Sequence, residues 1–201
     1  MGIEMCGRYF VEIGEEELRE IVAEAERNAR WRDFGGGEVF PGTVAPVIAS
    51  SGAGFMKWGF PGGDGRRPLI NARSETAAVA RAFCEAWADR RCIVPASGYF
   101  EWKPAGAGLK EKYAFTLPNR QPMYMAGIYS PCGQFAILTR DAAPALAAIH
   151  GRMPVIIPKP LAGAWLRASP SAAGEALGEA LEDLRFAAVP PAGGQQMSLF
   201  G

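Results

Sequence analysis

The chain has 201 residues with 21 basic and 21 acidic side chains, and almost half of its residues are apolar. This length fits one domain with an ordinary core. Apolar runs stay shorter than the roughly 20 residues that a membrane helix needs, and glutamates interrupt the first 20 residues, which argues against a signal peptide. We therefore expect a cytoplasmic protein that does not enter a membrane.

The charges are unevenly distributed along the chain. Residues 39–160 contain 14 basic and 7 acidic side chains, whereas residues 1–38 contain 5 basic and 10 acidic ones. A basic middle segment favours a polyanionic partner when its charges share one face, and it is a plain solvated surface when they do not. Charge alone leaves both interpretations open.

Four cysteines are scattered without a CxxC pair, and the chain has a single histidine. Disulfides and a zinc site are therefore not expected, and nothing indicates another metal or an organic cofactor. A cysteine that matters in this chain would act as a thiol.

The first half of the chain mixes short strands with two helices. Residues 6–11 predict a strand, and residues 15–30 predict a helix with glutamates in its first turn. Residues 44–50 and 55–60 read as short strands. Residues 75–91 predict a second helix that places Val79, Phe83, Ala86 and Trp87 on one side.

From Cys92 onward, runs rich in β-branched and aromatic residues predict an antiparallel meander. The predicted strands are residues 92–102, 113–117, 123–130 and 134–139, followed by a short helix at 141–149, a strand at 152–157, a helix at 172–183 and a strand at 185–189. This order indicates an α+β fold with a twisted antiparallel sheet or a partly closed β-barrel flanked by helices. We expect one domain over residues 1–189 and a flexible tail over residues 190–201.

Cys6 follows a second possible initiator, Met5. A chain that begins at Cys6 carries a free α-amine beside its thiol, a 1,2-aminothiol that no internal cysteine offers. Both groups titrate near pH 8, and we expect the charge of Arg8 to lower the thiol pKa. Taken alone, a cysteine in a short strand is more often a buried packing residue.

Two residues could move protons. His150 is the one histidine, so any imidazole acid or base must be this residue, although a lone histidine is more often a packing or surface residue. Glu101 lies between Phe100 and Trp102 in a hydrophobic strand, where desolvation would raise its pKa toward neutrality. An outward-facing glutamate is the simpler alternative.

Three further residues could contact a nucleic acid. Asn71 and Arg73, in "INARSE", offer an amide and a fork-shaped cation for phosphate, or else a capping turn. Trp58 is a core residue by default, but an exposed tryptophan beside Lys57 would form a platform for base stacking.

Seven motifs occur in one order along the chain: "MCGRY" (5–9), "MKWGF" (56–60), "NARSET" (71–76), "RCIVPASGYFEWK" (91–103), "AGIY" (126–129), "FAILT" (135–139) and "HGRMPVII" (150–157). Together they resemble the SOS response-associated peptidase family, whose proteins recognise and covalently trap abasic sites in single-stranded DNA. The resemblance covers residues 6–157. It implies the fold of that family and single-stranded DNA with abasic sites as the partner.

The resemblance also implies roles for particular residues. Cys6 would be the crosslinking nucleophile, which forms a thiazolidine once it is N-terminal. Asn71 would hold the opened sugar, Glu101 would transfer protons and support reversal, and His150 would assist ring opening. Arg8, Arg73 and Arg152 match positions near phosphate, and Trp58 matches a position that supports the DNA at the damaged site.

Two other functions stay open. A thiol peptidase would use Cys6 with His150 and Glu101, chiefly to process its own N-terminus. A noncovalent single-strand binding module would need only Trp58 and the arginines. We expect a monomer that associates with the nucleoid.

The chain ends in "QMSLF", residues 196–200, after a Pro/Gly segment that cannot fold by itself. This motif resembles the short peptides that dock bacterial repair and replication proteins on the sliding clamp. Gln196, Leu199 and Phe200 would be its anchors, unless Leu199 and Phe200 fold back on the domain.

Overall fold

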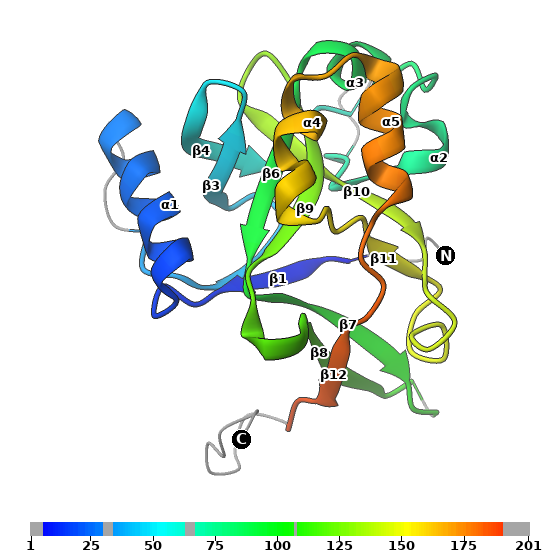
Figure 1. Ribbon diagram of the computed structural model, residues 1–201. Coiled ribbons are helices and arrows are strands. Elements are labelled where there is room, and N and C mark those ends of the chain that lie inside the picture. The colour runs from blue at the N-terminus through cyan, green and yellow to red at the C-terminus, as the bar shows by residue number, and fades with distance from the viewer. Residues whose placement is uncertain (1–5, 30–33, 63–66, 107, 191–201) are drawn as a thin grey trace.

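The computed structural model describes residues 6–29, 34–62, 67–106 and 108–190. In these ranges the chain forms two β-sheets with five α-helices around them (Figure 1), so the predicted α+β class is confirmed. Within the same ranges, every helix is too short or too polar to cross a membrane.

The first sheet has five antiparallel strands and lies in the lower half of Figure 1. Strand β1 lies between β7 and the short edge strand β2. The order is β12 (Arg185–Ala188), β8 (Lys110–Thr116), β7 (Gly98–Pro104), β1 (Arg8–Val11) and β2 (Gly37–Val39).

The second sheet contains a ring of five strands. Strand β9 pairs with β10, and this pairing closes the path that runs from β10 through β4, β3 and β6. The short strands β11 and β5 attach to β10 outside the ring. The bounds are β3 (Val44–Ala49), β4 (Gly52–Trp58), β5 (Asn71–Arg73), β6 (Arg91–Ala96), β9 (Met123–Tyr129), β10 (Gln134–Asp141) and β11 (Arg152–Pro154).

Two pairings differ from the antiparallel meander that the sequence predicts. Strand β10 runs parallel to β4 and also to β5. Parallel pairing needs a long connection between the partners. Residues 59–133 supply it, and a reading of neighbouring segments does not reveal such a distant pairing.

The run at residues 92–102, predicted as one strand, forms two strands in different sheets. Strand β6 belongs to the ring and β7 to the five-stranded sheet, with Ser97 between them. The Ser97 N–H donates to the Phe10 carbonyl at 2.9 Å, and the Ser97 hydroxyl accepts from the Glu12 N–H at 2.8 Å. Ser97 thus ties the crossing point to β1.

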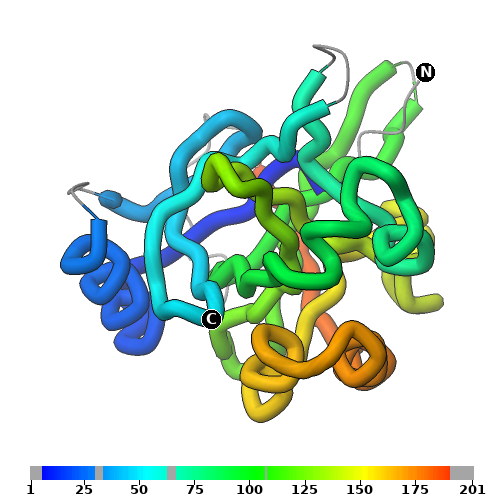
Figure 2. Tube along the Cα trace, turned by 90° about the horizontal axis from the view of Figure 1, so that it is seen from above, coloured from blue at the N-terminus to red at the C-terminus, as the bar shows by residue number. Residues whose placement is uncertain are grey.

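Three helices cover the ring from different directions. Helix α1 (Glu16–Asn28) buries Leu18, Ile21 and Ala25 and packs against β3 and β4. Helices α4 (Ala162–Arg167) and α5 (Pro170–Gly178) lie away from α1, as the view from above shows (Figure 2). The Trp165 indole N–H of α4 donates to the Cys92 carbonyl of β6 at 2.8 Å. Helix α4 was not predicted.

Two predicted helices are wrong. Residues 75–91 form α2 (Ser74–Ala77) and α3 (Cys84–Asp89) with turns between them, and Val79 is 82% exposed instead of buried. The break lets Phe83 pack edge-on against Phe60, with ring centroids 5.3 Å apart. Instead of a helix over residues 141–149, Asp141 ends β10 and residues 144–149 form turns; the Ala142 N–H donates to the Gly151 carbonyl, and Pro144 has no N–H to donate.

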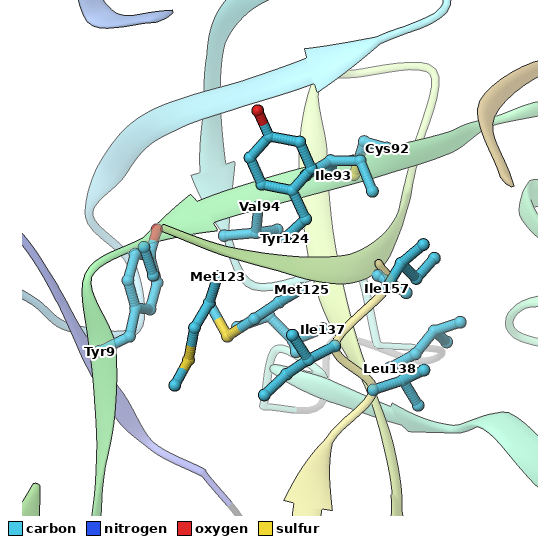
Figure 3. Packing of buried hydrophobic residues seen from close by; sticks show 14 of the residues in the cluster. Tyr9, Cys92, Ile93, Val94, Met123, Tyr124, Met125, Ile137, Leu138 and Ile157 are labelled. Atoms are coloured by element: carbon cyan, nitrogen blue, oxygen red, sulfur yellow. The ribbon is translucent and has the colours of Figure 1, made fainter. Parts of the chain in front are cut away.

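The core lies inside the ring and against β1. Figure 3 shows Tyr9 of β1 beside Met123 and Met125 of β9, with Ile137 of β10 nearby, and all four belong to one buried cluster. Because β1 contributes to this cluster, Cys6, two residues before β1, lies at the junction of the two sheets.

Candidate active site

Cys6 and Glu101 meet at the junction of β1 and β7. The register pairs Arg8 with Phe100, so the chain just before β1 runs alongside Glu101. The Cys6 backbone N–H donates to Oε1 of Glu101 at 2.7 Å. Cys6 is 1% exposed and Glu101 is 2% exposed, so this hydrogen bond is shielded from water.

Burial changes the acidity of both side chains. It raises the pKa of Glu101 to about 8, against hydrogen bonds from the N–H groups of Cys6 and Trp102 that favour the carboxylate. Burial, and then the nearby Glu101 charge, raise the pKa of the Cys6 thiol well above its usual range. A protonated carboxyl therefore lies beside a protonated thiol near neutral pH.

The expectation that the positive charge of Arg8 lowers the thiol pKa is wrong. The Arg8 guanidinium pairs with Glu38 at 3.5 Å and lies over the rings of Phe40 and Trp102, at 4.7 Å and 5.0 Å from their centroids. Arg8 favours the thiolate only through a backbone hydrogen bond, which does not offset burial.

His150 completes a row of three groups. Its Nδ1 lies 3.7 Å from Oε1 of Glu101, the same oxygen that accepts from Cys6. The ring follows the turns at residues 144–149 and lies two residues before β11, and it is mostly buried. The imidazole and the Cys6 nitrogen thus face one carboxyl group from two directions.

Asn71 reaches the same point from β5. Its Nδ2 donates to the Cys6 carbonyl oxygen at 3.3 Å. Strand β5 is aligned by its parallel pairing with β10, in which Asn71 faces Ile137. The structure thus brings together all four residues predicted as catalytic, Cys6, Asn71, Glu101 and His150, from four separate segments.

The four residues predicted to contact DNA fall into two pairs. Arg73 is exposed and the Arg8 side chain is 40% exposed, so both cations are accessible. Trp58 is completely buried and the Arg152 side chain is 9% exposed.

A base-stacking platform at Trp58 is therefore ruled out in this structure, because no ring face is open to a base. Its ring stacks on Phe135 at 6.3 Å and packs against Tyr9 at 5.2 Å. Its indole N–H donates to the Ile70 carbonyl at 2.9 Å, which satisfies the polar atom inside the core. Through this hydrogen bond Trp58 holds Ile70, the residue directly before β5, and so helps to fix the position of Asn71.

A direct phosphate contact from Arg152 does not fit this structure either. Its guanidinium is held by the carboxylates of Glu75 and Asp141 and by Thr139. Glu75 lies inside the "NARSET" motif, but no role was predicted for it. The only signal was one cation in an otherwise apolar strand, which needs a carboxylate partner when it is buried.

The described ranges contain no group of three or more His, Cys, Asp or Glu side chains placed to hold a metal ion. All four cysteines are free thiols, with Cys6 and Cys92 buried and Cys132 exposed. Gln196, Leu199 and Phe200 lie outside the described residues.

The fold and this site define an α+β protein of two sheets whose buried cysteine and carboxyl group meet at the sheet junction. The model of the SOS response associated peptidase (SRAP) family matches residues 5–192, and the chain belongs to this family.

Relatives and solved structures agree with this assignment. The chain is 33% identical over 178 residues to the abasic site processing protein YedK of Escherichia coli, covering 81% of this chain and 80% of that protein. It is 26% identical over 185 residues to the abasic site processing protein YoqW of Bacillus subtilis, with the same coverage of each. A crystal structure from Bordetella bronchiseptica matches with a TM-score of 0.74 at 26% identity, covering 92% of this chain and 100% of that one.

Proposed function

We propose that this protein binds abasic sites in single-stranded DNA and joins to them covalently through an N-terminal Cys6. The observation that carries the proposal is the 2.7 Å hydrogen bond between the Cys6 nitrogen and Glu101. Through this contact Glu101 would transfer protons to and from the atom that attacks the sugar aldehyde. The names of the relatives, abasic site processing proteins, supply the substrate class.

The chemistry needs both the nitrogen and the sulfur of Cys6. The α-amine adds to the open-chain aldehyde, and loss of one water gives an imine. The thiol sulfur then adds to the imine carbon while its proton passes to the nitrogen, which closes a five-membered thiazolidine. Aldehyde and aminothiol thus give thiazolidine and water, with no oxidant or reductant.

Glu101 would serve the loss of water. Burial raises the pKa of Glu101 to about 8 in the chain that retains residues 1–5, so this desolvated carboxyl group is the one that would hold a proton and give it to the departing hydroxyl. His150, 3.7 Å from the same oxygen, would assist the opening of the sugar ring and replenish that proton. Asn71 would hold the opened sugar, and Glu101 would return a proton to the ring nitrogen when the crosslink reverses.

Two exposed cations near the site would contact the DNA backbone. Arg8 follows Cys6 by two residues, and Arg73 follows Asn71 by two residues. Guanidinium groups bind phosphate in a bidentate manner, so they would anchor the strand on either side of the missing base.

The amine is free only if the bond between Met5 and Cys6 is absent. This condition is met when translation starts at Met5 and that methionine is removed, or when residues 1–5 are removed by processing. Thiol peptidase activity would instead need a Cys6 thiolate paired with His150, and the raised thiol pKa works against that pair. Covalent capture is therefore the function that the geometry supports best.

The test uses an oligonucleotide with one abasic site and denaturing electrophoresis. A chain beginning at Cys6 should give a heat-stable shifted band, and the Cys6→Ser variant, which keeps the amine, should not retain a stable crosslink. Cys132→Ser is the matched control, because it removes an exposed thiol outside the site. The proposal would be overturned by equal crosslinking of a chain that retains residues 1–5, in which the Cys6 amine is blocked, or by equal crosslinking of Cys6→Ser.

A further inference from the structure

The buried guanidinium of Arg152, in β11, contacts strand β10 and helix α2. Its Nη1 lies 2.6 Å from Oε1 of Glu75 and 2.5 Å from Oδ1 of Asp141. Its Nη2 lies 2.9 Å from Oε2 of Glu75 and 2.7 Å from the Thr139 carbonyl oxygen. The pair with Glu75 is thus bidentate, the geometry in which arginine and carboxylate bind most strongly.

This ion pair connects two elements that are weakly held otherwise. Strands β5 and β11 have three residues each, and both pair with β10. Glu75 lies in α2, directly after β5, and Arg152 begins β11. The ion pair spans β10 and fixes the two short strands relative to each other.

The two fixed strands carry the two sides of the site. Strand β5 contains Asn71, and His150 lies two residues before the start of β11. The backbone of Arg152 also contacts the imidazole, because Nδ1 of His150 lies 3.2 Å from the Arg152 nitrogen and 3.1 Å from its carbonyl oxygen. The ring nitrogen that faces Glu101 is therefore oriented by the residue that Glu75 anchors.

Within the described ranges Glu75 forms no hydrogen bond or ion pair with Cys6 or Glu101, and its side chain is 45% exposed. Its carboxylate pairs with Arg152, whose guanidinium holds the pKa of Glu75 below its ordinary value. An arginine already balanced by two carboxylates is a poor phosphate ligand, because a third anion would meet their repulsion.

We propose that Glu75 is a positioning residue, which acts through its bidentate pair with Arg152 to hold His150 against Glu101 and Asn71 against Cys6. This inference rests on the proposed function for its catalytic readout. It assigns Arg152 a role in the architecture of the site.

The test compares Glu75→Gln with Glu75→Asp in a chain that begins at Cys6. Glutamine removes the charge at nearly constant shape, and aspartate restores a carboxylate. Glu85→Gln is the control, because Glu85 forms a 3.5 Å surface pair with Arg90 and its side chain is 87% exposed. Crosslinking is followed over a range of abasic-oligonucleotide concentrations, and thermal unfolding confirms that each variant is folded.

We expect Glu75→Gln to lower the maximal crosslinking rate by about tenfold, since small displacements of reacting groups are costly. The half-saturating DNA concentration should stay within about twofold, Glu75→Asp should recover part of the rate, and Glu85→Gln should match the parent. An unchanged maximal rate in Glu75→Gln overturns the inference. A raised half-saturating concentration with an unchanged maximal rate also overturns it, because the pair would then serve DNA binding.

A second measurement does not depend on crosslinking. The chain has one histidine, so the ring-nitrogen NMR signals belong to His150 alone. In the parent these shifts should report one fixed tautomer, and in Glu75→Gln they should move toward the averaged values of a free imidazole. Identical shifts in both chains would refute the positioning role even if the parent traps no DNA, so the two failures are distinguishable.

Discussion

Cys6 and Glu101 are 95 positions apart in the chain, yet the nitrogen of one donates to the carboxyl group of the other inside the protein. The pairing of β1 with β7 brings the two residues together. The chain enters this sheet as β7 after it leaves the other sheet at Ser97. The site is thus a product of the sheet junction. The first consequence is that reactivity at Cys6 should depend on the protonation of a residue from another strand.

The pH dependence of crosslinking should show this coupling. In the proposed mechanism the Cys6 amine must be neutral to attack and Glu101 must hold a proton to donate it, so the rate should rise as the amine deprotonates near pH 8 and then fall as the carboxyl group ionises. Glu101→Gln should be slower at every pH and should lack this descending limb. Single-turnover rates between pH 6 and 9.5 would check it, and a limb that persists in Glu101→Gln would assign it to another group.

The free energy of unfolding should also depend on the ionisation of Glu101. The folded-state pKa of Glu101 lies near 8 and its ordinary value near 4.5, so between these values the folded state binds more protons than the unfolded state. Its contribution is therefore most favourable below about pH 4.5 and is lost as pH rises to about 8, by roughly 3–5 kcal/mol.

Urea unfolding at pH 5 and pH 8 tests this linkage. Glu101→Gln has no group to ionise at this position, so the free energy of unfolding should fall less with pH in the variant than in the parent. All other groups titrate in both chains and cancel in the comparison. Parallel pH dependences would show that Glu101 ionises normally.

The thiols should differ in reactivity. Cys132 is exposed in the turn between β9 and β10, whereas Cys6 is buried with a raised pKa. Because only an accessible thiolate is alkylated rapidly, iodoacetamide should modify Cys132 at least about tenfold faster than Cys6 at pH 7.5. Peptide mass spectrometry over a time course measures both rates, and faster modification of Cys6 would contradict its burial.

Arg91 should be a strong determinant of stability. Its buried guanidinium donates to the carbonyl oxygens of Trp87 and Ala88 in α3 and of Trp165 and Ala168 at the end of α4. Arg91→Met leaves these acceptors without their donor and should lower the free energy of unfolding by about 3 kcal/mol.

The matched control for Arg91 is Arg140→Met, which removes a surface ion pair with Glu182. That pair should be worth less than about 1 kcal/mol. Denaturant unfolding compares the two variants, and equal losses would show that the carbonyl contacts of Arg91 contribute little.

The C-terminal motif makes a separate prediction about a partner. A peptide of residues 190–201 should bind a bacterial sliding clamp, and Leu199→Ala with Phe200→Ala should abolish binding because the apolar anchors are lost. Fluorescence anisotropy with a labelled peptide measures both affinities. Equal binding of the parent and variant peptides would show that Leu199 and Phe200 do not anchor the tail on the clamp.

The sequence by itself predicted the α+β class, helix α1 and most of the strands, and it named the candidate site residues. The periodicity of Leu18, Ile21 and Ala25 predicted α1, and the resemblance of the ordered motifs to a known family implied that Cys6, Asn71, Glu101 and His150 share one site. These features depend on residues near one another or on their order, which a linear reading contains.

Only the tertiary structure decided which of these side chains are buried and what they face. Strand alternation left Glu101 open to either an outward or a desolvated position, and the junction of two sheets buried it beside Cys6. The same holds for Trp58, enclosed by Phe135 and Tyr9, and for Arg152, neutralised by Glu75. Burial and charge pairing depend on which distant strands become neighbours, and that is set by the packing of the whole chain.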